Sequence, residues 1–178
     1  MKRLHKDQRG LTIIELLVVM ILTGLITAAI TTTFFQVFDM NTRTANHMSA
    51  VSQVQQAGKL VSEDILEAQA VRAEGAMGFP LSLNWTEGGM DGDSHEIIYT
   101  LEDMPSGEFK RLQREHKINS VPESITIVAE YIDTDQTSCV CSCNPCDCAG
   151  KVLTFTVTAK VGEESEQRIY RVQPRSGT

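Results

Sequence analysis

The chain has 178 residues, a length that suits one modest domain with an N-terminal segment but not two full domains. Its formal net charge of −7 is divided unevenly, because residues 1–10 carry +3 and leave −10 on the remainder. An acidic body of this kind argues against nucleic acid as a general partner and suits a water-facing domain.

The N-terminal segment is predicted to span a membrane. Residues 11–37 read LTIIELLVVMILTGLITAAITTTFFQV, and residues 16–38 contain no charged residue. A spanning helix needs about 20 apolar residues, so this run is long enough. Basic residues precede the run and Asp39 follows it, so the positive-inside rule predicts a cytoplasmic N-terminus and a C-terminal body on the outside.

Glu15 is the acid within this apolar run. A carboxylate at the centre of a membrane helix costs about 2.5–3.5 kcal/mol on insertion scales, and less near the membrane edge. An acid in such a place usually has a partner. The neighbouring sequence after the basic leader supplies none.

Residues 10–19, GLTIIELLVV, resemble the class III leader of type IV prepilins and type II secretion pseudopilins. The family pattern is Gly, then usually Phe-Thr-Leu-Ile-Glu, then an apolar helix. This chain departs from it at Leu11 and Ile13, which are also large and apolar. The resemblance implies that Gly10 is the last leader residue, that Leu11 becomes the N-methylated N-terminus, and that Glu15 is the acid at the fifth mature position.

The resemblance also implies a reason for Glu15. Cleavage after Gly10 would create a cationic amine at Leu11, and Glu15 of a neighbouring subunit could neutralise it. A charge pair in apolar surroundings is worth forming only when both members are present. Such a pair would set the register of otherwise featureless helix packing, as a buried polar residue does in a coiled coil.

The implied function is structural and not enzymatic. The chain would be cut by prepilin peptidase and assembled with other pilin or pseudopilin subunits by an inner-membrane platform. The product would be a type IV pilus, a competence filament or a type II secretion pseudopilus. Before assembly the chain would be a single-pass protein of the inner membrane, and afterwards part of a filament at the cell surface.

Other interpretations of the N-terminal run remain. It could be a plain signal anchor in which Glu15 is incidental, or a secretory signal cleaved near residues 27–29. The alternative function is a membrane-anchored extracytoplasmic module that binds metal or a partner through its cysteines, without a filament. No enzyme motif stands out, and neither nucleic acid nor a cofactor is expected.

The rest of the sequence predicts an α+β, pilin-like fold. A helix from residue 11 to about residue 73 would have a spanning half, 11–38, and an amphipathic half, 39–75, ended by Gly75. Apolar or small residues recur in the second half at spacings of three or four. This stripe comprises Met48, Val51, Val54, Gly58, Val61, Ile65 and Ala68.

After residue 75 the hydrophobic period changes from helical to two, as in strands. Strands are expected at residues 81–85, 95–101, 109–114, 124–132, 151–161 and 167–172. Short turns between consecutive strands imply an antiparallel sheet, which would form an extracytoplasmic β-rich domain over residues 76–178.

The same order of features is loosely similar to the minor pilins and pseudopilins called the W and J types. In those proteins an Ile-x-Tyr strand precedes a Leu-x-Arg strand, and a late strand ends near Pro-Arg. The matching segments here would be Ile97-Ile98-Tyr99, Leu112-Gln113-Arg114 and Pro174-Arg175. This resemblance implies a minor subunit.

All five cysteines fall within residues 139–148, expected to form a loop between two strands: Cys139, Cys141, Cys143, Cys146 and Cys148. Disulfides persist outside the cytoplasm, so two disulfides and one remaining thiol are the leading interpretation. A thiolate site for zinc or copper(I) and an intersubunit bridge stay open. The sequence does not decide the pairing, although bridges across the loop are favoured over bridges within a C-x-C pair.

Two charged segments complete the candidate sites. Residues 87–96 are acidic and glycine-rich, which indicates a solvated turn or a calcium site that uses Asp91 and Asp93. Lys110, Arg111, Arg114, His116 and Lys117 form a basic patch, interpreted as a solvated sheet face or a set of subunit salt bridges. Three scattered histidines, His5, His47 and His116, are expected at the surface.

Overall fold

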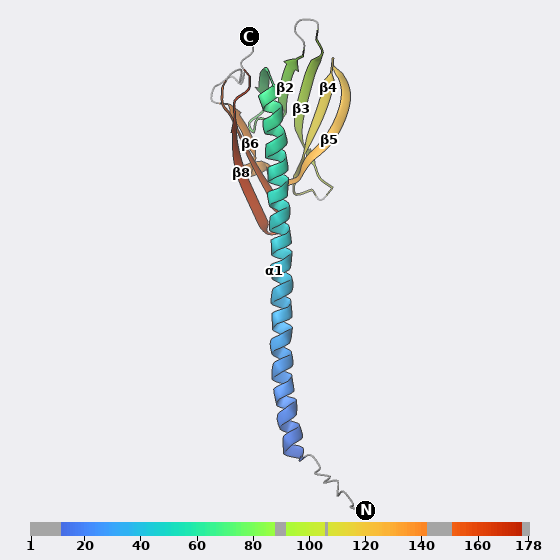
Figure 1. Cartoon of the computed structure of the whole chain (residues 1–178), viewed down its shortest axis with the longest axis vertical. Coiled ribbons are helices and arrows are strands. Elements are labelled where there is room, and N and C mark those ends of the chain that lie inside the picture. Colours follow the sequence, from blue (N-terminus) through green and yellow to red (C-terminus); the bar gives the residue numbers. More distant parts are fainter. Residues whose placement is uncertain (1–11, 88–91, 106, 142–150, 176–178) are drawn as a thin grey trace, which may run out of the picture. The chain divides into compact units, whose positions relative to one another are not determined.

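The computed structural model describes residues 12–87, 92–105, 107–141 and 151–175 (Figure 1). The chain divides into two compact units, residues 1–42 and residues 43–178. Helix α1, Ile13–Glu67, contributes to both units.

In the first unit, the described chain is the beginning of α1. Its large apolar side chains are exposed, and Phe34 and Phe38 stack one turn apart. Threonine hydroxyls along it donate to carbonyl oxygens three or four residues earlier at 2.7–3.2 Å. The helix therefore satisfies its own polar groups and presents an apolar surface.

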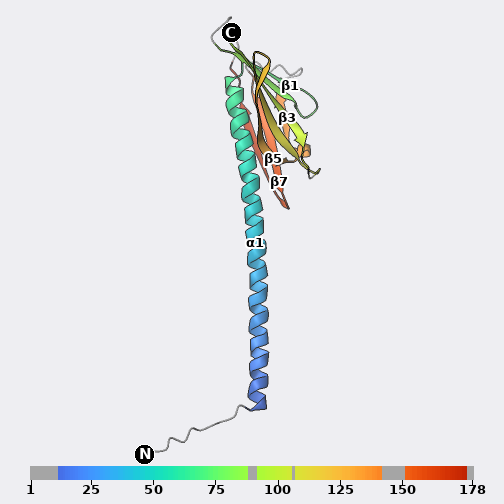
Figure 2. The same ribbon diagram turned by 90° about the vertical axis from the view of Figure 1, so that its right-hand side faces the viewer.

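In the second unit, α1 packs one face against the sheet (Figure 2). The predicted stripe is confirmed from Val54 onward, since Val54, Gly58, Val61 and Ile65 are buried. Its beginning was wrong, because Met48 is 67% exposed. Ala50 and Ala57 occupy the contact face as well, and their small side chains let the helix approach the sheet closely.

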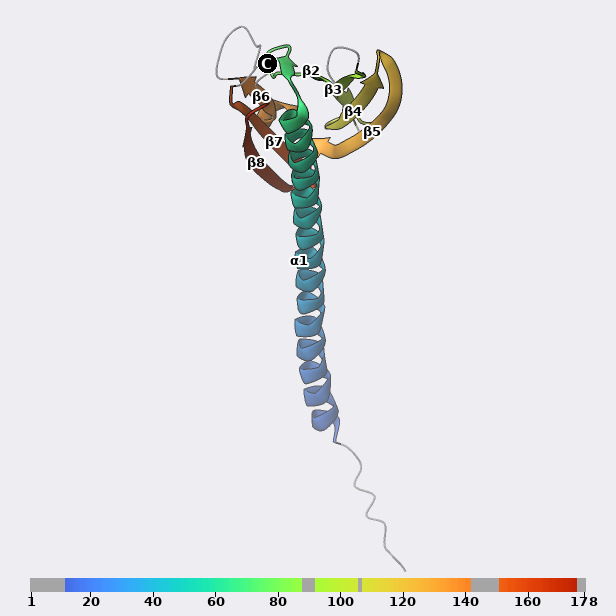
Figure 3. The same cartoon turned by 45° about the horizontal axis from the view of Figure 1, so that its top comes forward.

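Among the described residues, the strands form one antiparallel sheet in the order β1-β2-β3-β4-β5-β7-β6, with β8 paired to β7 (Figure 3). The strands are β1 (Ala70–Ala73), β2 (Leu81–Thr86), β3 (Ser94–Asp103), β4 (Lys110–Ile118), β5 (Val121–Ile132), β6 (Ser138–Cys141), β7 (Leu153–Val161) and β8 (Glu164–Val172). Figure 3 shows β5 curving from beside β4 toward β7, so the sheet is curled. The α+β, pilin-like prediction is confirmed.

The bend in β5 has a local cause. Lys110 pairs with Ile132 and Leu112 pairs with Ala129, so β5 has an extra residue at this point. Tyr131 lies in the bulge with φ of 59°, a left-handed conformation that few residues other than glycine adopt. The bulge redirects the strand, and this lets one sheet curl around the helix.

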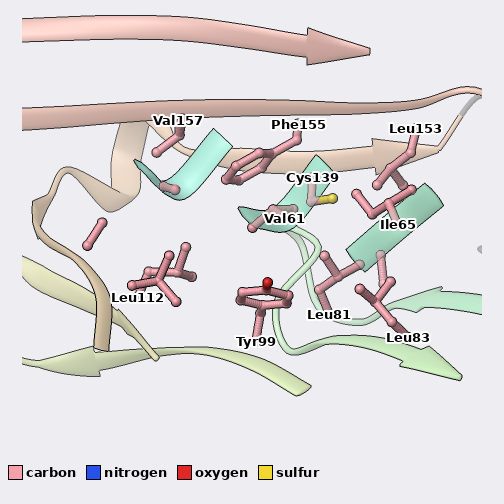
Figure 4. Close-up of a cluster of buried hydrophobic side chains, with 14 of the residues drawn as sticks. Val61, Ile65, Leu81, Leu83, Tyr99, Leu112, Cys139, Leu153, Phe155 and Val157 are labelled. Carbon is pink, nitrogen blue, oxygen red and sulfur yellow. The ribbon is translucent and has the colours of Figure 1, made fainter. Parts of the chain in front are cut away.

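The core lies between α1 and the inner face of the sheet. Val61 and Ile65 of the helix meet Leu81, Tyr99 and Phe155 of the strands (Figure 4). These side chains are all fully buried. Because alternate residues of each strand point inward, the same face that buries this core also carries the polar groups described below.

Two predicted elements end or begin elsewhere. The helix ends at Glu67 and not near residue 73, because the chain then pairs with β2 as strand β1. Val71 and Ala73 are buried and alternate with exposed residues, so β pairing prevails over helix propensity here. The predicted cysteine loop also begins too early, because Cys139 and Cys141 lie on strand β6 with buried side chains.

Candidate functional site

The first described residues form a reciprocal cap on α1. The backbone N–H and the hydroxyl of Thr12 each donate to Oε2 of Glu15 at 3.0 Å. The backbone N–H of Glu15 donates in return to the Thr12 hydroxyl at 3.3 Å. This Thr-x-x-Glu arrangement is a capping box, which fixes where the helix begins.

Glu15 therefore has a partner that the sequence interpretation missed. The pattern could have revealed it, since Ser or Thr three residues before Glu marks a helix start. Gly10 and Leu11 lie outside the described residues. The carboxylate sits in the first turn of α1 and is exposed in the single chain, so it is open to a further contact with a cation.

Beyond the cap, α1 is long and apolar enough to cross a membrane. In the first unit, the helix exposes large apolar side chains, and no charged residue occurs from residue 16 to residue 38. An exposed apolar surface of this extent is not stable in water and needs lipid or other apolar helices around it. With the leader before it, this helix suits a single-pass inner-membrane anchor.

In the second unit, a buried ionic contact joins the helix to the sheet. Asp64 of α1 is 6% exposed and receives two hydrogen bonds from Arg114 of β4, at 2.7 Å from Nε and 3.1 Å from Nη2. The hydroxyl of Tyr99 on β3 donates to the same carboxylate. Tyr99 and Arg114 are directly paired across β3 and β4, so the ladder aims both groups at one point.

The surroundings shift the pKa of both partners of Asp64. Burial, reinforced by the negative charge of Asp64, raises the pKa of Tyr99 far above its ordinary value. The hydrogen bonds to Asp64 raise the pKa of Arg114. Tyr99 therefore remains a neutral donor and Arg114 a cation, so the carboxylate is fully satisfied.

This contact unites two of the segments singled out in the sequence, because Tyr99 and Arg114 are the ends of the Ile-x-Tyr and Leu-x-Arg segments. Asp64 itself was missed. It lies three residues after Val61 on the buried stripe, a position that could have indicated an inward-facing acid. Pro174 is buried, and Arg175 donates its backbone N–H to the carbonyl of Ala68 at 3.2 Å.

A second polar cluster lies on the same face of the sheet. His95 and His116 bring Nδ1 and Nε2 within 3.1 Å of each other, and the ring of Trp85 stacks on His95 with centroids 5.1 Å apart. His116 was expected at the surface, but its side chain is 17% exposed and is held by Glu123 at 2.8 Å. The expectation was wrong because β3 and β4 pair the two histidine segments.

The basic patch is largely neutralised within the chain. Besides Arg114 and His116, its cations form the ion pairs Lys110–Asp103 at 3.0 Å, Arg111–Glu102 at 2.7 Å and Lys117–Glu115 at 3.4 Å. These pairs lie between neighbouring strands or along one strand. Arg111 and Lys117 fit the interpretation as a solvated sheet face, whereas Arg114 and His116 face inward, so the five cations do not form one exposed patch.

The metal predictions find no support in the part of the chain that the structure describes. No group of three or more His, Cys, Asp or Glu residues there could hold a metal ion. Asp93 instead accepts a hydrogen bond from the side chain of Asn119 at 2.8 Å. Asp91, Cys143, Cys146 and Cys148 lie outside the described residues.

Comparison with known proteins bears on the leader. Residues 5–31 match the prokaryotic N-terminal methylation motif. The match covers the second half of the basic leader, the capping box and the beginning of α1, and it confirms the resemblance found in residues 10–19. No curated protein and no solved structure matches the chain.

Proposed function

We propose that this type IV pilin-like precursor is a minor structural subunit, cut by prepilin peptidase after Gly10 and assembled through α1 into a type IV, competence or type II secretion filament. The observation that carries the proposal is the methylation motif at residues 5–31, which includes the start of the apolar helix and Glu15 in its first turn. The role is structural and not enzymatic.

Topology follows from the same segment. The basic leader stays in the cytoplasm, α1 crosses the inner membrane, and the acidic sheet domain lies outside, later at the filament surface. The partners are prepilin peptidase, the inner-membrane assembly platform and other pilin or pseudopilin subunits. The second unit, whose core lies between the later part of α1 and the sheet, can fold outside while the first part of α1 is still in lipid.

Glu15 has two successive contacts in this scheme. In the single chain its carboxylate receives the hydrogen bonds of Thr12 and closes the helix start. In the filament it also receives the cationic amine of methyl-Leu11 from a neighbouring subunit. Both contacts are compatible, because an ionised carboxylate accepts several hydrogen bonds. The amine of the neighbouring subunit supplies the cationic partner that the apolar run lacks.

Processing is tested by the intact mass of the protein purified from its host membrane. We expect a chain that begins at Leu11 and carries one methyl group on its amine. A variant with a large residue at the cleavage site, Gly10→Val, should keep the full leader and stay out of filaments. Wild-type protein that retains Met1 to Gly10 in its mature state would refute the proposal.

The contribution of charge at Glu15 can be separated from its capping. Glu15→Gln keeps a side-chain oxygen for the capping box but removes the charge, whereas Thr12→Ala weakens the cap by about 1 kcal/mol and keeps the charge. We expect Glu15→Gln to be processed normally yet to be nearly absent from sheared filaments. Thr12→Ala should assemble. The reverse pattern would show that capping, and not an intersubunit pair, is what Glu15 supplies.

The proposal of a minor role is supported by the resemblance to the W and J types. Tyr99 and Arg114, the last residues of two segments that carry this resemblance, both bond to Asp64. Quantitative mass spectrometry of purified filaments tests it. We expect the chain at a small fraction of the most abundant subunit. Finding it as the main component would make it a major pilin, while leaving processing and assembly intact.

A further inference from the structure

The histidine pair occupies a defined place on the inner face of the sheet. His95 lies four residues before Tyr99 on β3, and His116 lies two residues after Arg114 on β4, so all four side chains share one face. Trp85 on β2 pairs with His95 in the ladder. The side chains of both histidines are largely buried, at 12% and 17% exposed.

The two imidazoles meet edge to edge. Their facing nitrogens, Nδ1 of His95 and Nε2 of His116, are 3.1 Å apart, whereas the ring centroids are 5.4 Å apart with planes inclined by 14°. The facing nitrogens are thus the closest parts of the rings. This is the geometry of an N–H···N hydrogen bond, in which one nitrogen carries the proton and the other does not.

A carboxylate lies behind each ring. Oε2 of Glu123 is 2.8 Å from Nδ1 of His116, so that nitrogen carries a hydrogen and donates it. In the neutral ring Nε2 of His116 must then accept from Nδ1–H of His95. Oε2 of Glu87 lies 3.9 Å from the remaining nitrogen, Nε2 of His95. The four side chains form a line from Glu123 to Glu87 with one vacant proton position at its Glu87 end.

Of the other charged groups nearby, Arg114 and Asp93 are already engaged. Arg114, the next inward-facing residue on β4, is bonded to Asp64 of the helix. At the hairpin end, Asp93 accepts from Asn119. Glu67 and Arg175 line a cavity of about 360 Å³ together with Trp85 and Glu87. Glu87 and Glu123 are therefore the carboxylates that face the histidine nitrogens directly.

We propose that His95 and His116 form a proton-sensing pair that holds one extra proton in place and is split by a second. The first proton binds Nε2 of His95, faces Glu87, and leaves the N–H···N bond intact. The second proton can bind only Nε2 of His116, where it replaces the accepting lone pair. Two N–H groups then face each other, and the rings separate.

Trp85 couples this event to the sheet. Its ring lies parallel to His95, with planes inclined by 6°, and to His116, with planes inclined by 8°. Separation of the imidazoles removes part of the surface on which Trp85 stacks. The inner face near the ends of β2 and β3 therefore changes its packing in acid, while the Asp64 contact further along the strands stays closed.

The chain contains one tryptophan, so fluorescence reports on this cluster alone. Full-length protein in detergent micelles is titrated from about pH 8 to about pH 5, the range in which histidine changes charge. We expect the emission of Trp85 to change in two steps. Both His95→Gln and His116→Gln should remove the second step, and Glu123→Gln should shift the transition to lower pH. His47→Gln, at an exposed helix position, is the matched control and should leave the titration unchanged.

A measurement on the wild-type protein avoids any folding defect of the variants. Hydrogen–deuterium exchange at the imidazole C2 position, read by mass spectrometry, gives the titration of each histidine separately. We expect the exchange profiles of His95 and His116 to differ from that of exposed His47, because the two rings share one hydrogen bond. Equal midpoints that match His47, or a tryptophan signal that is constant across the range, would overturn the proposal.

Discussion

Tyr170 of β8 lies so close to Gly58 of α1 that a Cβ on residue 58 would come within 2.0 Å of its ring. The Tyr170 hydroxyl also donates to the carbonyl of Val54 at 3.4 Å. The absence of a side chain at residue 58 is what lets an aromatic ring contact the helix backbone so closely. Helix and last strand are joined there by shape, as α1 and β4 are joined by charge through Asp64.

The close approach predicts that Gly58→Ala destabilises the protein although alanine favours helix. Overpacking typically costs about 1–3 kcal/mol, against a gain of up to about 1 kcal/mol in helix propensity. Urea unfolding of the full chain in detergent, followed by circular dichroism, measures the difference. Gly24→Ala is the control, because a Cβ there has no atom within 4 Å. Combining Gly58→Ala with Tyr170→Leu should cost less than the two changes added separately.

The contact between Asp64 and Arg114 predicts a large loss of stability when only one of the two partners is replaced. Arg114→Leu leaves a buried carboxylate with Tyr99 as its remaining donor, a change that typically costs about 3–5 kcal/mol. The double variant Asp64→Leu with Arg114→Leu should be more stable than Arg114→Leu alone. Arg43→Leu is the matched control, since its pair with Glu163 is exposed, and it should unfold like wild type. Equal unfolding midpoints for Arg114→Leu and Arg43→Leu would contradict this reading.

Tyr99 predicts a loss of stability in alkali. Burial beside Asp64 raises its pKa in the folded state, whereas an unfolded tyrosine ionises near about pH 10. Above that pH the unfolded chain releases a proton that the folded chain keeps, so the free energy of unfolding falls as pH rises. Below that pH the contribution is fully present. Unfolding measured from about pH 8 to about pH 11 should show this fall in wild type and in Tyr131→Phe, and less of it in Tyr99→Phe.

The cysteine segment predicts two disulfides and one thiol in the mature protein. Alkylation of the denatured, unreduced protein should therefore modify one of the five cysteines, and peptide mapping should show bridges across the segment. Protein from cells that lack the disulfide-forming machinery outside the cytoplasm serves as the comparison. Modification of all five cysteines in protein from an oxidising compartment would contradict the prediction and favour the thiolate alternative.

Long, strongly periodic segments were predictable from sequence. The helix and the strands β2, β3, β4, β5, β7 and β8 each combine a clear period with turn residues at their ends. β1 was not, because Ala70–Ala73 has helix-forming residues and becomes a strand only through its pairing with β2. β6 is four residues long and lies within a cysteine pattern that indicates a loop. In both cases a contact distant in sequence decides the structure.

The polar contacts were only partly predictable, for a related reason. Glu15 stood out because a charge interrupts an apolar run. Asp64 did not, because an acid on a helix is ordinarily solvated, and its burial depends on Arg114, 50 residues later. His95 and His116 are 21 residues apart, and only the register of β3 with β4 reveals that they meet.

If the subunit passes from bilayer to filament, as proposed above, the threonines of the first unit have a consequence for that transfer. After Thr12, whose hydroxyl donates to Glu15, each hydroxyl donates to a carbonyl of its own helix, so this stretch needs no polar neighbour. A lipid tail and another such helix are then nearly interchangeable surroundings. In the proposed assembly, extraction from the membrane breaks no hydrogen bond along this stretch, and the same surface serves in the membrane and in the filament. The residues that allow this are Thr23, Thr27, Thr31, Thr32, Thr33 and Thr42.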